Sequence, residues 1–129
     1  MIKVSVYRDE SGRTCGFHCV GHAGYAAKGQ DIICAAVSAL TMTAVNAVEQ
    51  FSGDTFSYRE KENAGEMDFK VASPMSEASE LILKSLLLGL SMIEESYGRR
   101  FIRVDAGNWQ IVLEGGEGHV EDEPSVFRS

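Results

Sequence analysis

The chain has 129 residues, a formal net charge of −7 and a hydrophobic fraction of 44%. This length and balance are typical of one globular domain with its own core, and they exclude a largely disordered chain. No run of 18 apolar residues occurs and the N-terminus lacks a signal-peptide pattern, so we expect neither a membrane span nor secretion but a cytosolic protein.

Charge is unevenly distributed along the chain. Residues 114–129 contain five acids and one arginine, so they carry −4 and leave −3 for residues 1–113. No basic stripe is present, which argues against direct binding of nucleic acid and makes a basic protein the easier partner. We predict a single domain over 1–113, followed by an acidic, mobile tail over 114–129.

Hydrophobic periodicity predicts the secondary structure. Alternation with period two predicts strands at 2–8, 13–20, 54–61, 66–72 and 101–105, with a sixth at 109–113 after a turn. Helical spacing predicts helices over 31–51 and 74–97, with Asp31 as N-cap of the first and Pro74 opening the second. The order ββαββαβ(β) favours an α+β fold in which two long helices pack on an antiparallel sheet.

The three cysteines are Cys15, Cys19 and Cys34, and an odd number without a signal peptide indicates reduced thiols. Cys15 and Cys19 share one strand face with Phe17, so we expect them in the core. A zinc site that joins them to His22 and Cys34 is the alternative. Strand residues four apart lie about 13 Å apart, which is too far for two sulfurs on one zinc ion. We therefore predict neither a metal nor a cofactor.

Chemistry is most plausible between residues 21 and 38. With Asp31 as N-cap, Cys34 lies in the first helical turn, where unpaired N–H groups and the helix dipole lower a thiol pKa. The same N–H groups could hold an oxyanion, and His22, in the loop before the helix, could pair with the thiolate. The competing interpretation is that Cys34 is a small buried residue on an Ala-rich helix.

Neighbouring residues have open roles. Asp31 could cap the helix, orient His22 or simply be solvated. Ser38, one turn after Cys34, could line the site or bond back to the helix carbonyl at position 34. Gly24 and Gly29 flank a loop that would then be free to close over a substrate.

The run Gly21-His22-Ala23, then Gly29, then Asp31-Ile32-Ile33-Cys34-Ala35-Ala36-Val37-Ser38, resembles the ribosomal-processing cysteine protease (Prp) family. The resemblance extends along residues 1–105. It implies a small α+β homodimer without a cofactor, in which His22 and Cys34 form the catalytic dyad. Asp31 and Ser38 would be supporting residues, and Gly21, Ala23, Gly24 and Gly29 would belong to the substrate loop.

The resemblance also implies a substrate. Family members remove the N-terminal extension of large-subunit ribosomal protein twenty-seven, cutting after hydrophobic, aromatic residues, and this step serves ribosome assembly. Two alternatives make different structural predictions. A thioesterase or amidase for small molecules predicts a deep enclosed pocket, and a non-catalytic assembly factor that binds a ribosomal protein predicts a buried, unreactive Cys34.

Overall fold

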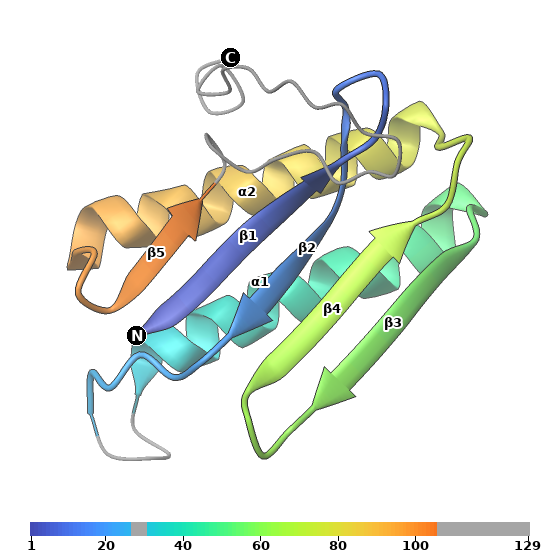
Figure 1. The fold of residues 1–129 in the computed structure, drawn as a ribbon. Helices are drawn as coiled ribbons and strands as arrows, with labels where there is room; N and C mark the ends of the chain where they lie inside the picture. The colour runs from blue at the N-terminus through green and yellow to red at the C-terminus, as the bar shows by residue number, and fades with distance from the viewer. Residues whose placement is uncertain (27–30, 106–129) are drawn as a thin grey trace.

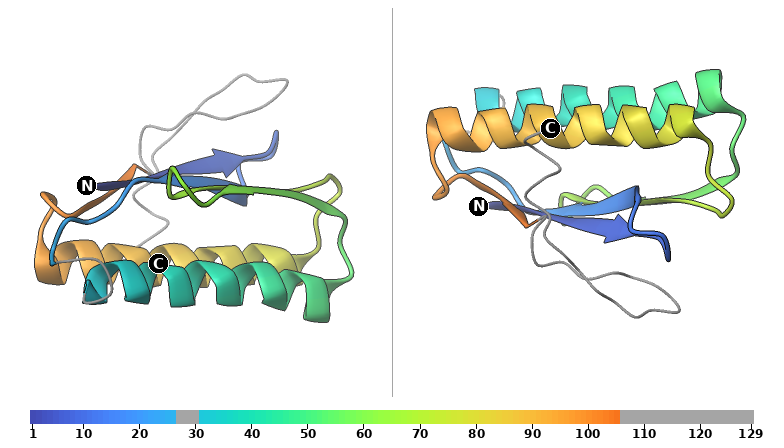
Figure 2. Two further views of the ribbon diagram at one scale, coloured as in Figure 1. Left: turned by 90° about the horizontal axis from the view of Figure 1, so that it is seen from below. Right: turned by 90° about the horizontal axis from the view of Figure 1, so that it is seen from above.

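Two helices cover one face of a five-stranded sheet in the computed structural model, which describes residues 1–26 and 31–105 (Figures 1 and 2). The elements in chain order are β1 (Ile2–Arg8), β2 (Thr14–Val20), α1 (Ile32–Ala47), η1 (Val48–Ser52), β3 (Phe56–Lys61), β4 (Glu66–Val71), α2 (Glu77–Tyr97) and β5 (Ile102–Asp105). The predicted α+β fold of order ββαββαβ is confirmed. The predicted sixth strand and the acidic tail lie outside the described residues.

The strands of the sheet are arranged in the order β3-β4-β2-β1-β5. The predicted hairpins β1–β2 and β3–β4 are antiparallel, and β2 pairs antiparallel with β4. Only the pair β1–β5 is parallel within the described residues, with Ile2 opposite Ile102. The sheet is therefore mostly antiparallel, and α2 returns the chain from β4 to the far side of β1 (Figure 1).

The first helix begins where the sequence predicts. The Asp31 carboxylate accepts hydrogen bonds from the backbone N–H groups of Ile33 and Cys34, as an N-cap does. The α-helix changes to a π-helical turn at Val48, and Gly53 caps its end. By length and mean hydropathy (1.6), the helical segment Ile32–Ser52 could cross a membrane. The absence of 18 consecutive apolar residues therefore does not by itself exclude a membrane span. Core helices of soluble proteins pass the same test, and one face of α1 packs in the core.

The second helix begins later than predicted. The N-cap of α2 is Ser76, whose hydroxyl accepts a hydrogen bond from the Ser79 N–H. Pro74 therefore precedes the helix. The Asp54 carboxylate accepts hydrogen bonds from both the Ser76 and Ser79 hydroxyls, so a residue distant in sequence helps to fix this start. Local proline chemistry could not reveal that contact.

The core lies between the sheet and the helices. Phe17 of β2 and Phe69 of β4 are fully buried, with ring centroids 5.8 Å apart, and Leu90 of α2 is equally buried. Cys15 and Cys19 belong to this core, as predicted from their shared strand face. The segment that connects β2 to α1 therefore follows a strand that is packed in the core.

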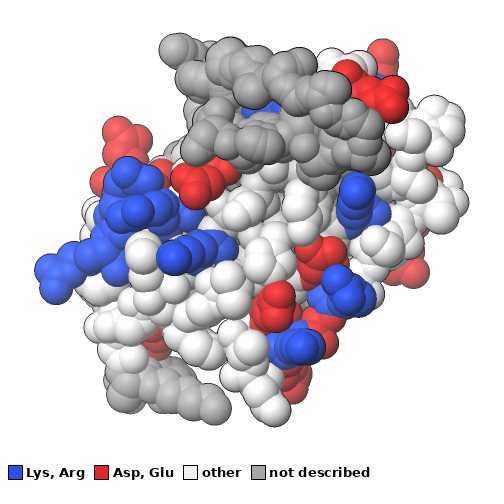
Figure 3. All heavy atoms as spheres, in the orientation of Figure 1, with Lys and Arg blue, Asp and Glu red and all other residues white. Residues whose placement is uncertain are grey.

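The other sheet face has no helix over it within the described residues (Figure 2). It carries polar pairs, including a hydrogen bond from the Tyr7 hydroxyl to Asp68 and a 2.7 Å contact between His18 Nε2 and Glu66 Oε2. Figure 3 shows Lys and Arg side chains gathered at the left of this face and mixed with Asp and Glu at its lower right.

Candidate active site

A small cavity lies where β2 ends and α1 begins. Its volume is about 180 Å³, and both His22 and Cys34 line it. Ser38 and Gly21 also line it, and the turn between β3 and β4 contributes Gly65. The structure therefore brings the two residues of the predicted dyad to one cleft, although Cys34 follows His22 by 12 positions.

Cys34 is half-buried in the first turn of α1, and its Sγ accepts a hydrogen bond from the Ala23 backbone N–H at 3.3 Å. Burial raises the pKa of this thiol, the Ala23 N–H lowers it, and the Asp31 carboxylate raises it again. The net direction is upward. The predicted depression of the pKa by the helix N-terminus is therefore wrong, because desolvation and a nearby negative charge outweigh the N–H groups.

Asp31 connects the helix to the loop before it. One carboxylate oxygen caps α1 and the other accepts a hydrogen bond from the Tyr25 N–H at 3.1 Å. Desolvation raises the pKa of this carboxyl, but hydrogen bonds from the N–H groups of Cys34 and Tyr25 hold it below its usual value. Of its three proposed roles, capping is the one that these contacts show.

The predicted oxyanion site at the helix N-terminus differs from the structure. The N–H groups of Ile33 and Cys34 both donate to Asp31 Oδ1, and the Ala35 N–H donates to the Asp31 carbonyl. These donors are therefore already engaged. The Ala23 N–H, which points at Sγ itself, is the backbone donor next to the thiol.

His22 follows β2 by two residues, and its ring lies against Gly65. Among the hydrogen bonds between described residues, none joins the His22 ring to the Cys34 thiol. Catalytic hydrogen bonds are often long in a free enzyme and shorten when substrate binds. The cleft thus holds both groups without a direct bond between them.

The remaining predicted site residues vary in what they contribute. Gly21 and Ser38 line the cleft, and Ala23 is buried and supplies its N–H to the thiol. Gly24 has a positive φ of 72° and no contact with the cavity among the described residues. Gly29 lies outside the described residues.

Sequence reasoning did not single out Tyr25, and it gave Cys19 a place only in the core or in the alternative zinc site. The Tyr25 ring makes edge-to-face contacts with Tyr97 and Phe101, which anchor the loop that precedes Asp31 to the end of α2. Cys19 lines the same cavity as Cys34, and burial, together with the Cys34 charge, raises its pKa to about 11. Alternation predicted that Cys19 faces the core but could not show that this part of the core borders the cleft.

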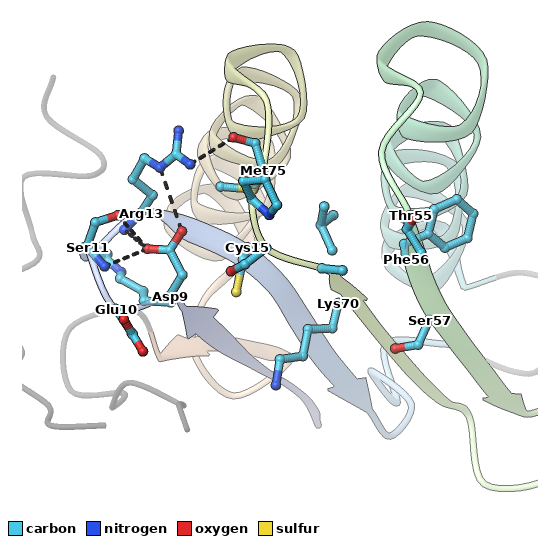
Figure 4. A pocket seen from close by; sticks show the side chains of 15 residues that line it. Asp9, Glu10, Ser11, Arg13, Cys15, Thr55, Phe56, Ser57, Lys70 and Met75 are labelled. Atoms are coloured by element: carbon cyan, nitrogen blue, oxygen red, sulfur yellow. Dashed lines mark hydrogen bonds and ion pairs between the residues drawn. The ribbon is translucent and has the colours of Figure 1, made fainter. Parts of the chain in front are cut away.

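A larger cavity of about 790 Å³ lies at the opposite end of the sheet, near the β1–β2 turn (Figure 4). Cys15 and Lys70 line it, and Arg13 there donates to the Met75 carbonyl at 2.8 Å. None of the described residues that line it is a histidine. Because its thiol lacks an adjacent imidazole, its size does not make it the better candidate for thiol chemistry.

A half-buried cysteine and a histidine in one cleft, set on an α+β scaffold, are the parts of a hydrolase that uses a thiol nucleophile. Residues 1–102 match the family described as Cysteine protease Prp. The chain belongs to this family, and the enzyme is therefore a cysteine protease.

Curated relatives support this assignment. The ribosomal processing cysteine protease Prp of Staphylococcus aureus is 29% identical over 97 residues, which are 75% of this chain and 92% of the relative. The protein of the same description from Bacillus subtilis is 29% identical over 101 residues, 75% of this chain and 90% of that protein. The similarity thus spans nearly the whole relative in each case.

Solved structures share the fold. The essential ribosomal processing protease Prp from S. aureus, in complex with a covalently linked product peptide, matches with a TM-score of 0.76 and 28% identity. The S. aureus protease in complex with a substrate peptide matches with a TM-score of 0.72 and 27% identity. Each match covers 81% of this chain and 98% of the other.

Proposed function

We propose that this protease removes the N-terminal extension of large-subunit ribosomal protein twenty-seven, with Cys34 as nucleophile and His22 as general base and acid. The observation that carries the dyad is that both side chains line one cleft at the β2–α1 junction. The family assignment and the peptide-bound S. aureus structures support the substrate class.

The raised pKa of Cys34 favours one of two routes to the nucleophile. A thiol that is largely protonated at rest does not form a standing thiolate–imidazolium pair with His22. Instead, His22 takes the thiol proton as Sγ attacks the scissile carbonyl carbon, so the S–C bond forms while the S–H bond breaks. The Ala23 N–H donates to Sγ and so stabilises negative charge on the sulfur as the thiol proton leaves.

Breakdown of the tetrahedral intermediate completes acylation. The C–N bond breaks, the leaving amine takes the proton from His22, and the substrate's N-terminal fragment stays on Cys34 as a thioester. A water molecule then attacks the thioester carbonyl and gives a proton to His22, and the C–S bond breaks. The released thiolate recovers that proton, which restores the resting enzyme without any metal or cofactor.

The cleft distinguishes this proposal from its alternatives. A cavity of about 180 Å³ is smaller than the roughly 300–1,000 Å³ typical of enclosed small-molecule pockets. This size argues against a thioesterase or amidase with a deep pocket. Cys34 is half-buried rather than fully buried, which argues against a purely structural thiol in a binding factor.

The direct test is a cleavage assay on a peptide that spans the extension junction of the host's ribosomal protein twenty-seven. We expect wild type to make one cut after an aromatic residue, read by mass spectrometry. Cys34→Ala should abolish the cut, and Cys15→Ala, which changes a cysteine outside the cleft, should retain it. A wild-type enzyme that leaves this junction intact, while it cuts other peptides, would refute the substrate.

We also propose that the enzyme is a homodimer joined through the outer face of its helices. Leu81, Leu88 and Met92 lie 65%, 48% and 58% exposed on one stripe of α2, and Phe51 at the end of η1 is 78% exposed. No charged residue occurs in α1. Such an apolar surface is typical of an interface between copies.

Light scattering would measure the oligomeric state. The double substitution Leu88→Glu and Met92→Glu should convert a dimer into a folded monomer, because it places charges in the apolar stripe. Lys3→Glu is the control, because this exposed lysine of β1 points away from the face of the sheet that the helices cover, and it should leave the dimer intact. A wild-type monomer at micromolar concentration would contradict the proposal.

A further inference from the structure

The turn between β3 and β4 contacts the histidine of the site. A Cβ atom built on Gly65 would lie 3.0 Å from both Cε1 and Nε2 of His22. The same atom would lie 3.0 Å from the Gly21 carbonyl oxygen. A methyl group at Gly65 would therefore press on the His22 ring, which would have to give way by a few tenths of an ångström.

This turn is held firmly relative to the end of β2. The Gly21 N–H donates to the Gly65 carbonyl at 3.1 Å, so the residue before His22 is bonded to the turn itself. The Gly65 N–H donates in turn to the Glu62 carbonyl at 3.1 Å. One residue further on, Glu66 of β4 is the register partner of Val20 of β2. The turn thus cannot retreat without breaking backbone bonds.

Gly21 is confined on its other side as well. A Cβ on Gly21 would lie 2.3 Å from the Met1 carbonyl oxygen, and its φ is 107°. The backbone that precedes His22 is therefore fixed between the chain's first residue and the β3–β4 turn. Since the backbone cannot move, crowding at Gly65 would be relieved by displacement of the His22 ring.

We propose that Gly65 is a positioning residue for the reaction, because its bare Cα sets the place of the His22 ring relative to Cys34. This inference rests on the proposed role of His22 as base and acid. Gly65 itself touches neither substrate nor a reacting atom. A purely structural alternative exists, since a φ of 61° favours glycine in any turn.

Matched substitutions separate the two roles. Gly65→Ala adds both backbone strain and a methyl group against the ring. Gly12→Ala, in the β1–β2 turn at φ 87° with no atom within 4 Å of the new Cβ, adds backbone strain alone. Gly65→Asn tests the contact with less strain, because asparagine tolerates a positive φ, and it serves if the alanine variant does not fold.

Peptide cleavage measures the consequence for catalysis. We expect both Gly65 variants to lose about threefold to tenfold in kcat/KM, mostly in kcat, because the His22 ring must give way by a few tenths of an ångström and a misplacement of about 1 Å costs about a hundredfold. Gly12→Ala should stay within about twofold of wild type in kcat/KM, although backbone strain at its positive φ lowers its melting temperature. Equal kcat/KM in the Gly65→Ala and Gly12→Ala variants would overturn the inference.

A second measurement needs no substrate. The NMR chemical shift of the His22 Cε1–H proton, assigned by comparison with His22→Gln, should move in both Gly65 variants and stay in place in Gly12→Ala. An unmoved resonance in folded Gly65→Ala would overturn the inference even if the protease is active. If instead the resonance moves but wild type cleaves no peptide, the contact is real and the proposed function fails.

Discussion

The negatively charged Asp31 carboxylate lies beside the Cys34 thiol and raises its pKa. The substitution Asp31→Asn removes that charge. Asparagine is as good an N-cap as aspartate, so the first turn of α1 should persist. In the native enzyme the Asp31 carboxylate raises the pKa of Cys34 both by its charge and through a hydrogen bond with the thiol. The substitution should therefore lower the pKa of Cys34, while burial still keeps it from falling far.

The magnitude follows from the fraction of thiolate. Because the ordinary value is 9.0 and that of Cys34 lies above it, fewer than about one thiol in a hundred is ionised at pH 7. Each unit of decrease in the pKa multiplies that fraction about tenfold. We expect the substitution to accelerate alkylation at pH 7 by about threefold to tenfold.

Iodoacetamide labelling between pH 6 and pH 11, followed by mass spectrometry of the intact protein, measures the rate. Cys15 and Cys19 are buried, and a Cys34→Ala variant gives their background. The native rate should still be rising above pH 9, and the Asp31→Asn profile should shift to lower pH. An unchanged or slower reaction of Asp31→Asn at pH 7 would refute the conclusion that this carboxylate suppresses the thiolate.

Two predictions concern stability. Leu90→Ala empties a site that is fully buried under the sheet and should cost about 3–5 kcal/mol in the free energy of unfolding, whereas the exposed Lys84→Ala on the same helix should stay within about 0.5 kcal/mol, as urea titration would show. Hydrogen bonds from the hydroxyls of Ser79 and Ser76 lower the pKa of Asp54, so its contribution is complete above the ordinary value of 3.8 and is lost as pH falls through the lower folded value. Asp54→Ala should therefore destabilise the protein at pH 7 by about 1–3 kcal/mol and lose that difference in strong acid, and an equal loss at both pH values would contradict this linkage.

Local patterns were sufficient for much of the fold. Period-two alternation located β1 and β2 to within one residue, and a single capping residue, Asp31, located the start of α1. Both signals depend on neighbours in the chain. The start of α2 was misplaced because it depends on Asp54, which lies 22 residues before Ser76.

The site was predictable in its composition and less so in its electrostatics. The helix dipole pointed to a low pKa for Cys34, yet the direction is set by burial and by the carboxylate, which only the folded chain brings together. Likewise, Asn63-Ala64-Gly65 reads as a turn in the sequence, but its contact with His22 joins residues more than 40 positions apart. Non-local packing of this kind leaves no signal in periodicity.

The parallel pairing of β1 with β5 has a consequence for the newly made chain. Residues 2–5 find their partners at residues 102–105, so β1 remains the edge of an incomplete sheet until nearly the whole described chain has left the ribosome. The contact of the Met1 carbonyl with Gly21 belongs instead to the β1–β2 hairpin, in which Lys3 is opposite Val20, so it forms locally. Because pairing across such a separation comes late in folding, the sheet gains its fifth strand only after synthesis of the domain is nearly complete. A chain that ends before residue 102 contains both His22 and Cys34 but leaves the backbone N–H and C=O groups of β1 unpaired along one edge, where another strand could add.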